Sequence, residues 1–242
     1  MDLSSEEEKI KNDAIAFARK HKKEIAHKLT STDVFQQEDD PVSVFMAGSP
    51  GAGKTEASIA LLESKRMEGT NVLRIDADEL REEFPDYTGG NSWLFQAAAS
   101  ILVDKIHDFA LKQKQSFLLD GTLSKYDIAE KNIERSLKKK RFVQILYVYQ
   151  SPQAAWEFVL AREAKEGRRI LPEHFIEQYF AARKVVNALK SKFGKALSLD
   201  LLLKENDGTD RLYKAGVDQI DYHIPEKYTE TDILNIISKP LS

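Results

Sequence analysis

Hydrophobic residues recur along the chain with two different periods, and each period predicts a different kind of element. Short apolar runs rich in β-branched residues predict four buried strands: 42–47, a run from about 71 that ends at Asp76–Asp78, 116–119 and 142–149. Apolar residues at helical spacing predict helices at 4–29, from Lys54 onward, at 93–112, 126–139, 153–166, 172–192 and 230–238. Two late strands are expected at 196–206 and 210–224. Strands that alternate with helices predict an α/β fold, with a mostly parallel sheet flanked by helices.

The first forty residues are expected to form an extension of this fold. Ser4 and Glu7 fit a Ser-x-x-Glu capping box at the start of the first helix. The polar stretch TSTDVFQQEDDP, residues 30–41, ends in a proline and is typical of a linker. We therefore expect an N-terminal helical extension and linker at 1–40, followed by one main domain at 41–242.

A glycine-rich loop lies between the first strand and the helix that starts at Lys54. Its sequence, GSPGAGKT, matches G-x-x-x-x-G-K-[ST] without a gap and has the flanking strand and helix that this motif requires. Glycines let backbone N–H groups turn toward a phosphate chain, the lysine reaches the β- and γ-phosphates, and the threonine hydroxyl binds Mg²⁺. The residues predicted to bind nucleotide are Gly48, Ser49, Pro50, Gly51, Ala52, Gly53, Lys54 and Thr55. The fold expected for residues 41–242 is therefore of the P-loop NTPase type.

Carboxylates follow two of the predicted strands. Asp120 ends the strand in FLLDG and is expected to assist Thr55 at a magnesium site through water, since the carboxyl ends of such strands face the ligand. A plain strand-to-loop turn at Asp-Gly is the alternative interpretation. Asp76 and Asp78 follow the second strand, two residues apart, and so point the same way in an extended segment. One of them is expected to face the γ-phosphate and accept a proton from an alcohol. The other is expected to cap the next helix.

Basic residues gather in two places. Arg162, Arg168 and Arg169 flank a predicted bend between two helices, which is typical of a lid that closes over a transferring phosphoryl group. A solvated surface turn is the alternative interpretation. The run KKKR, residues 138–141, is expected to lie in solvent at a helix C-terminus.

The composition of the chain limits the classes of partner that we expect. The chain has 242 residues, a net charge of −3 and a pI near 6.0, so it lacks the strongly basic character of proteins that bind nucleic acid or membrane surfaces. It contains no cysteine, which excludes disulfides and thiolate metal sites. The acidic N-terminus MDLSSEEEKI does not resemble a secretion signal. We expect action in the cytoplasm, with delivery by a dedicated secretion system left open, and neither nucleic acid nor membrane as a partner.

Four segments in order give the chain a resemblance to the zeta toxin family, over roughly residues 42–225: GSPGAGKT, RIDADELREEFPDY, FLLDGT and AREAKEGRRILPEHF. The resemblance implies a kinase that phosphorylates a hydroxyl of a UDP-amino sugar, typically UDP-N-acetylglucosamine, with ATP or GTP and Mg²⁺. Many members of the family are toxins silenced by an antitoxin, so it also implies a possible antitoxin partner.

The resemblance also assigns roles to single residues. Asp78 corresponds to the catalytic base of the family, and Lys54 and Thr55 to its phosphate-binding lysine and metal ligand. Arg162 and Arg169 correspond to the two lid arginines, and Arg168 is close enough to exchange roles with Arg169.

Two positions depart from the family pattern. Asp104 corresponds to a substrate-binding acidic residue that is usually glutamate, and Phe84 stands where a histidine often precedes the proline. Both departures affect the identity of the sugar nucleotide more than the kinase chemistry.

Several alternatives remain open at this stage. The acceptor could instead be a nucleoside, NAD, an antibiotic or a nucleic-acid 5′ end. A nucleotide-dependent switch or motor is a different class, but neither a guanine-specifying Asn-Lys-x-Asp run nor motor motifs are recognisable in the sequence. The helix at 4–29 could be a family-like extension, an antitoxin-docking surface or an inhibitory element.

Overall fold

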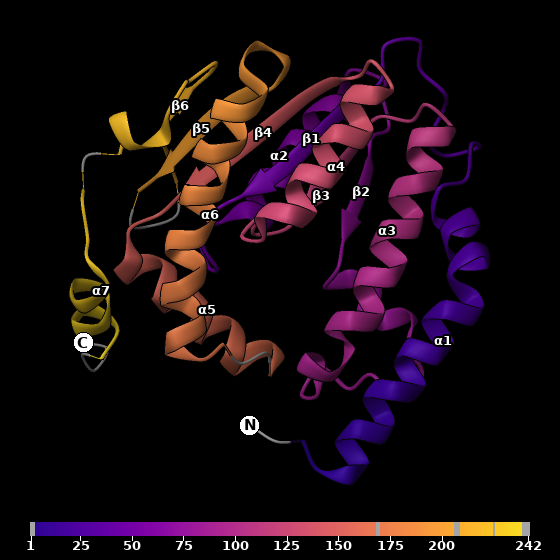
Figure 1. Cartoon of the computed structure of the whole chain (residues 1–242), viewed down its shortest axis with the longest axis horizontal. Helices are drawn as coiled ribbons and strands as arrows, with labels where there is room; N and C mark the ends of the chain where they lie inside the picture. The colour runs from indigo at the N-terminus through magenta and orange to yellow at the C-terminus, as the bar shows by residue number, and fades with distance from the viewer. Residues whose placement is uncertain (1–2, 168–169, 206–208, 225, 239–242) are drawn as a thin grey trace.

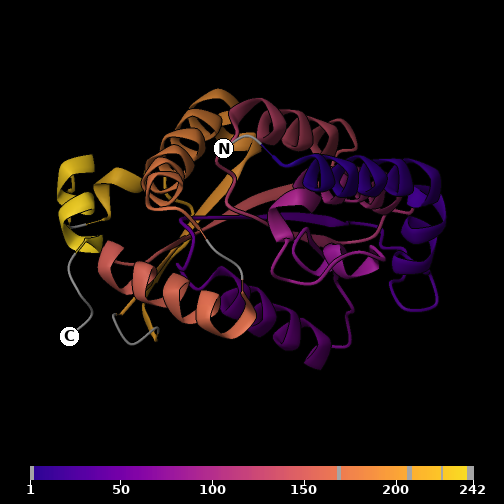
Figure 2. The ribbon, with the colours of Figure 1, turned by 90° about the horizontal axis from the view of Figure 1, so that it is seen from below.

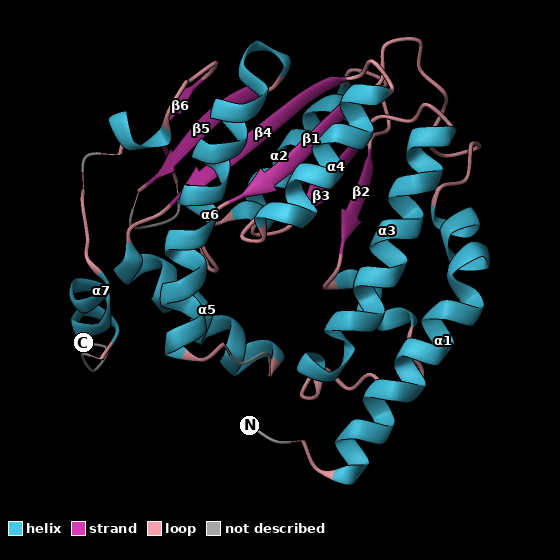
Figure 3. Ribbon diagram, in the orientation of Figure 1, coloured by secondary structure: helices cyan, strands magenta, loops and turns pink. Residues whose placement is uncertain are grey.

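A six-stranded sheet forms the centre of the protein in the computed structural model, which describes residues 3–167, 170–205, 209–224 and 226–238 (Figures 1 and 3). The strands are β1 (Val42–Ala47), β2 (Leu73–Asp76), β3 (Phe117–Asp120), β4 (Phe142–Tyr149), β5 (Ser198–Lys204) and β6 (Asp210–Lys214). Their order is β2-β3-β1-β4-β5-β6, with β1 to β5 parallel and β6 antiparallel to β5. The structure therefore confirms the predicted α/β fold with a mostly parallel sheet.

Seven α-helices are described: α1 (Ser5–Leu29), α2 (Lys54–Met67), α3 (Gln96–Lys112), α4 (Tyr126–Lys138), α5 (Pro152–Glu166), α6 (Pro172–Phe193) and α7 (Glu230–Ile237). Figure 2 shows α1, α3, α4 and α6 on one face of the sheet and α2 and α5 on the other. Helix α7 packs against α5 and α6. Among the described helices, none is long and apolar enough to cross a membrane.

Each face of the sheet has its own hydrophobic core, because successive strand residues point to opposite faces. Along β1, Phe45 and Ala47 belong to the larger core beneath α1, α3, α4 and α6. Val44 and Met46 belong to a smaller core beneath α2. Ala52 of the glycine-rich loop belongs to this smaller core, which therefore supports the loop.

Helix α1 packs along α3 and contributes Ala14, Ala18, Ile25 and Ala26 to the larger core. The capping box predicted at its start is present: the Glu7 N–H donates to Ser4 Oγ and the Ser4 N–H donates to Glu7 Oε2. The division of the chain at residue 40 stays a prediction.

One of the late strands is shorter than predicted. Strand β6 ends at Lys214, and the expectation of a strand through residue 224 is wrong. Gly216 adopts a positive φ of 66° and donates its N–H to Asp200 Oδ1, which ends the regular pairing of β6 with β5. The apolar residues beyond it, Val217, Ile220 and Ile224, belong instead to the larger core.

The KKKR run is only partly solvent-exposed. Lys138, Lys139 and Lys140 are exposed as predicted, but Arg141 is buried, so the expectation is wrong for that residue. Lys140 has a positive φ of 57°, which reverses the chain between α4 and β4 and turns the next side chain inward. The side chain of Arg141 ties together the segments that lead into three strands. It donates to Ser43 Oγ at 2.7 Å and to the carbonyls of Val42 and Gln115.

We expect Arg141→Met to lower the free energy of unfolding by about 1–3 kcal/mol, because it leaves buried acceptors without their charged donor. Lys139→Met, on the exposed side of the same turn, should change it by about 0.5 kcal/mol or less. Urea titrations of both variants measure the difference, and equal stability of the two would contradict the buried role of Arg141.

Candidate active site

The glycine-rich loop follows β1 at the place where the strand order reverses, with β3 on one side of β1 and β4 on the other. Ligands bind at such switch points in open α/β sheets. Two glycines permit the close packing of the loop. A Cβ at Gly48 would stand 2.3 Å from the carbonyl oxygen of Val148, and one at Gly51 would stand 2.0 Å from that of Ala155. The loop is therefore pressed against β4 and α5, and both positions require glycine.

Lys54 begins α2 and folds back over the loop. Its Nζ donates to the carbonyl oxygens of Gly48 at 3.1 Å and Ser49 at 2.6 Å. Desolvation by burial lowers the pKa of Lys54 to about 8. The charges of Asp120, Asp78 and Glu56 raise this pKa in part, and the charge of Arg162 lowers it further. Since these charges act on one ammonium group, the structure brings together four of the residues predicted from the sequence: Lys54, Asp120, Asp78 and Arg162.

Asp120, at the end of β3, is almost fully buried and belongs to a hydrogen-bonded cluster that the sequence did not reveal. Its Oδ2 accepts from Arg74 Nη2 at 2.7 Å and from Ser58 Oγ at 3.0 Å. Arg74 lies on β2 two residues before Asp76, and the same Nη2 donates to Asp76 Oδ2 at 2.6 Å. The period-2 spacing of Arg74 and Asp76 was the one available signal, because it places both side chains on one face of the strand.

The two aspartates of DAD occupy different environments. The Asp76 side chain is 13% exposed and pairs with Arg74, whereas the Asp78 side chain is 40% exposed. Burial and the charge of Asp120 raise the pKa of Asp76 to about 6. Asp76 Oδ1 accepts from the N–H of Asp78. Asp78 is the N-cap residue of a 3₁₀ turn at Glu79–Glu83, and that turn has no side-chain cap hydrogen bond, so the expectation that the other aspartate caps the next helix is wrong.

Asp78 is held by a buried arginine. Arg81 Nη1 lies 2.7 Å from Asp78 Oδ1, and Arg81 Nη2 donates to Gln96 Oε1 at 2.7 Å at the start of α3. The accessible carboxylate is thus oriented by a group that is itself fixed.

The residues around Thr55 fit a magnesium ion held mainly by nucleotide and water. Ser58 Oγ donates to the Thr55 carbonyl at 2.8 Å and also contacts Asp120 Oδ2, so one hydroxyl joins the two predicted ligands. Mg²⁺ is commonly bound by one or two protein oxygens together with phosphates and waters. The described part of the chain contains no group of three or more His, Cys, Asp or Glu residues that could hold a metal ion.

Of the predicted lid, the structure describes Arg162, on α5. Arg162 is half-buried in the last turns of this helix. The position where a Cβ of Gly167 would stand is 3.7 Å from the backbone of Gly90, so the C-terminal end of α5 lies close to the loop that holds Gly90. Arg168 and Arg169 lie outside the described residues.

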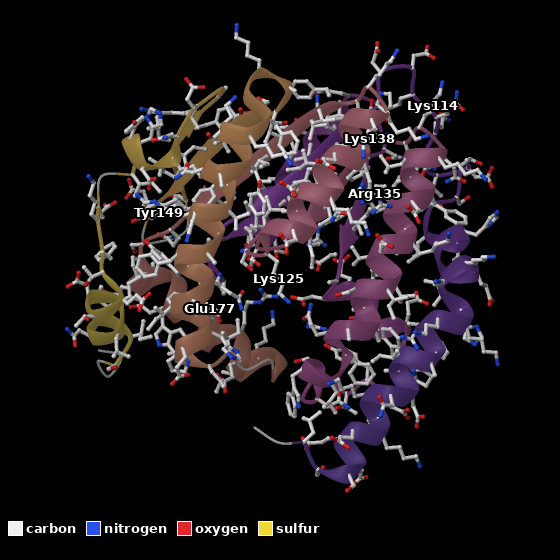
Figure 4. The ribbon with its side chains drawn as sticks, viewed as in Figure 1. Lys114, Lys125, Arg135, Lys138, Tyr149 and Glu177 are labelled. Carbon is white, nitrogen blue, oxygen red and sulfur yellow. The ribbon has the colours of Figure 1, made fainter. Side chains whose placement is uncertain are left out.

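Asp104 lies on α3, and its carboxylate is half-exposed. Arg135 of α4 donates to Asp104 Oδ1 at 2.8 Å and also pairs with Asp108. Figure 4 shows Arg135 between α4 and α3. Asp104 is thus engaged in an interhelical ion pair, and its predicted contact with substrate stays a prediction.

The sequence model of the family described as Zeta toxin matches residues 25–218, which is most of the chain. The chain belongs to the zeta toxin family. No curated protein sequence matches it.

Solved structures share the fold of this zeta toxin family member. One comes from the PezAT chromosomal toxin–antitoxin system of Streptococcus pneumoniae, with 17% identity, a TM-score of 0.61 and coverage of 97% of this chain and 94% of that chain. Another is the AvrRxo1-ORF1:-ORF2 complex with ATP, with 16% identity, a TM-score of 0.59 and coverage of 97% and 73%. Family membership, together with the phosphate loop, supports a nucleotide-dependent phosphotransferase of the kinase type.

The lowered pKa of Lys54 gives a pH test. A triphosphate favours the charged lysine, so its binding should raise this pKa and take up a proton at about pH 8.5, where much of the free protein has neutral Lys54. At about pH 6.5 the lysine is already charged, and uptake at this group should vanish. The apparent affinity for ATP should therefore fall as the pH rises through 8.

Calorimetry in two buffers of different ionisation enthalpy measures the proton count. Lys54→Arg is the matched control, because arginine keeps its charge at both pH values. Equal proton uptake by wild type and this variant at the higher pH would assign the proton to another group.

Proposed function

We propose that the protein is an ATP- or GTP-dependent kinase that phosphorylates a hydroxyl of a UDP-amino sugar similar to UDP-N-acetylglucosamine, and that it acts as a toxin. The observation that carries the proposal is the convergence of Lys54, Asp120, Asp78 and Arg162 on one phosphate loop in a member of the zeta toxin family. The reaction belongs in the cytoplasm, where nucleoside triphosphates and UDP-sugars are found.

The donor nucleotide is held by the loop backbone from Gly48 to Thr55 and by the positive end of α2. Lys54 supplies a positive charge to the β- and γ-phosphates. Thr55 and Asp120 would hold Mg²⁺, which neutralises charge on the phosphates when it is bound. ATP as donor is supported by the related fold of the AvrRxo1-ORF1:-ORF2 complex with ATP.

Asp78 is the proposed base, because its carboxylate is the more accessible of the two and is fixed by Arg81. The acceptor hydroxyl oxygen forms a bond to the γ-phosphorus while the bond from that phosphorus to the β–γ bridging oxygen breaks. The hydroxyl proton passes to Asp78, and the nucleoside diphosphate leaves with the bridging oxygen. In a loose transition state this proton moves late, so a weak base is sufficient.

The arginines of the lid stabilise charge on the transferring group. Arg162 is near enough to Lys54 to lower the pKa of that lysine by repulsion, so both cations face the same region. Two cations at one place are favourable when an anion with several charges lies between them. Arg169 is proposed as the second lid arginine on the basis of the family pattern, and Asp104 as a substrate-binding residue on the same basis.

An antitoxin is a proposed partner, since one structural neighbour comes from a toxin–antitoxin system. We propose no nucleic acid and no membrane as partners, which agrees with the net charge of −3.

Labelled ATP and a panel of acceptors test the substrate directly. We expect a UDP-N-acetylhexosamine to gain one phosphate, detected by mass, and nucleosides, NAD, aminoglycosides and oligonucleotides to remain unmodified. If only another acceptor becomes labelled, the protein is still a kinase, but a sugar nucleotide is not its substrate. Rapid ATP hydrolysis that no acceptor changes would favour a switch or motor.

Single substitutions test the roles. Asp78→Asn keeps the shape of the side chain and removes the proton acceptor, so kcat should fall about 10²-fold or more with little change in substrate affinity. Arg162→Ala should likewise lower kcat by about 10²-fold, more than it weakens ATP binding. Asp76→Asn is the matched comparison: if it is inactive while Asp78→Asn turns over, the base is Asp76.

A further inference from the structure

A buried carboxylate and a largely buried one lie side by side at the carboxyl edge of the sheet. Asp76 and Asp120 are register partners on the parallel strands β2 and β3, and their side chains are 13% and 5% exposed. Like charges at this spacing repel each other strongly when they are removed from water. One guanidinium nitrogen, Arg74 Nη2, donates to Oδ2 of both aspartates, at 2.6 and 2.7 Å.

The other nitrogens of Arg74 reach two further elements. Nε donates to Ser58 Oγ on α2 at 3.2 Å, and Nη1 pairs with Glu79 at the start of the 3₁₀ turn. Ser58 in turn contacts Asp120 and the carbonyl of Thr55. Arg74 therefore connects β2, β3, the turn that follows Asp78 and the helix that follows the phosphate loop.

The bonds to Asp120 all fall on one of its oxygens. Arg74 donates to Oδ2, and the Ser58 hydroxyl, whose one proton is shared between this oxygen and the Thr55 carbonyl, lies 3.0 Å from it. Oδ1 accepts no hydrogen bond from the residues that the structure describes. The terminal torsion of an aspartate is broad, and a half-turn about it only exchanges the two equivalent oxygens of the carboxylate. Hydrogen bonds that gather on one oxygen fix the plane of the Asp120 carboxylate, and the other oxygen accepts none from the described residues.

We propose that Arg74 is the positioning residue of the magnesium–nucleotide site: it fixes the carboxylate of Asp120 through one oxygen, so that the other would be available to Mg²⁺. The inference rests on the proposed kinase function and assigns a role to a residue outside the phosphate loop and the lid. Arg74 acts through Asp120 and Ser58. The arrangement needs the planar fork of arginine, because Nε, Nη1 and Nη2 are used in different directions. A lysine ammonium is a single point charge on a flexible stem and cannot reproduce it.

The experiment compares two binding constants in the full chain. Arg74→Lys keeps the positive charge, and Arg74→Met removes it. Calorimetry gives Kd for ATP with excess Mg²⁺ and for ATP in EDTA. We expect both variants to bind Mg·ATP about 10-fold or more weakly, as for other residues that orient metal ligands. Binding of ATP in EDTA should stay within about twofold, the scatter between sites that are energetically independent.

Two further variants complete the design. Arg66→Met, on the exposed part of α2, is the matched control and should change neither constant. Ser58→Ala removes one donor to Asp120 and leaves every charge in place, so it serves if Arg74→Met does not fold. It should weaken Mg·ATP binding selectively and by less than Arg74→Lys.

The outcomes separate the possible roles. An equal loss of affinity with and without Mg²⁺ would make Arg74 a general structural ion pair and overturn the inference. Wild-type affinity for Mg·ATP in Arg74→Lys would overturn it as well. A wild type that binds Mg·ATP but phosphorylates no acceptor would refute the proposed function alone, since the binding comparison needs no acceptor.

Discussion

The parallel pairing of β2 with β3 places Asp76 beside Asp120, and the whole charged cluster depends on that register. The register is determined on the opposite face of the two strands. Leu73, Ile75 and Phe117 are buried in the larger core, and a slip of one residue would turn them toward α2. Hydrophobic burial on one face therefore forces two acidic side chains together on the other. Arg74 and Ser58 make this arrangement tolerable, because buried charges must be paired and hydrogen-bonded.

The nucleotide loop was predictable because its chemistry is local. Eight consecutive residues carry the glycines, the lysine and the threonine, and the strand and helix on either side are visible as apolar runs. The partners of Arg74 are not local. Ser58 lies 16 residues away and Asp120 lies 46 residues away, so only the folded sheet brings them together. The same reason explains Arg141, whose acceptor Ser43 is 98 residues away. The end of β6 could not be predicted, because the apolar residues after Gly216 continue the pattern of a strand. In the structure those residues belong instead to the larger hydrophobic core.

The choice between the two aspartates shows what burial adds to a motif. The sequence placed Asp76 and Asp78 two apart and left their roles open. In the structure Asp76 pairs with Arg74 and accepts a hydrogen bond from the backbone N–H of Asp78. The Asp78 carboxylate is more accessible and pairs with Arg81. The raised pKa of Asp76 follows from its burial next to Asp120. A perturbed pKa in a site is often a sign of a catalytic group. In this site the greater exposure of the Asp78 carboxylate and its ion pair with Arg81 favour Asp78 over Asp76 as the proposed base.

Phe84 connects the segment of Asp78 to the N-terminal helix. It is 3% exposed, and its ring centroid lies 5.7 Å from that of Phe17 on α1 and 5.5 Å from that of Phe95. A histidine at this position would place a polar ring in an apolar contact, so the phenylalanine suits a chain in which α1 covers this side. Helix α1 also buries a row of alanines and Ile25 in the larger core. Its detachment would expose this surface at a cost of about 25 cal/mol per Å² of apolar area. This cost argues against α1 as an inhibitory element that swings away, and in favour of α1 as a fixed support for the segment that carries Asp78.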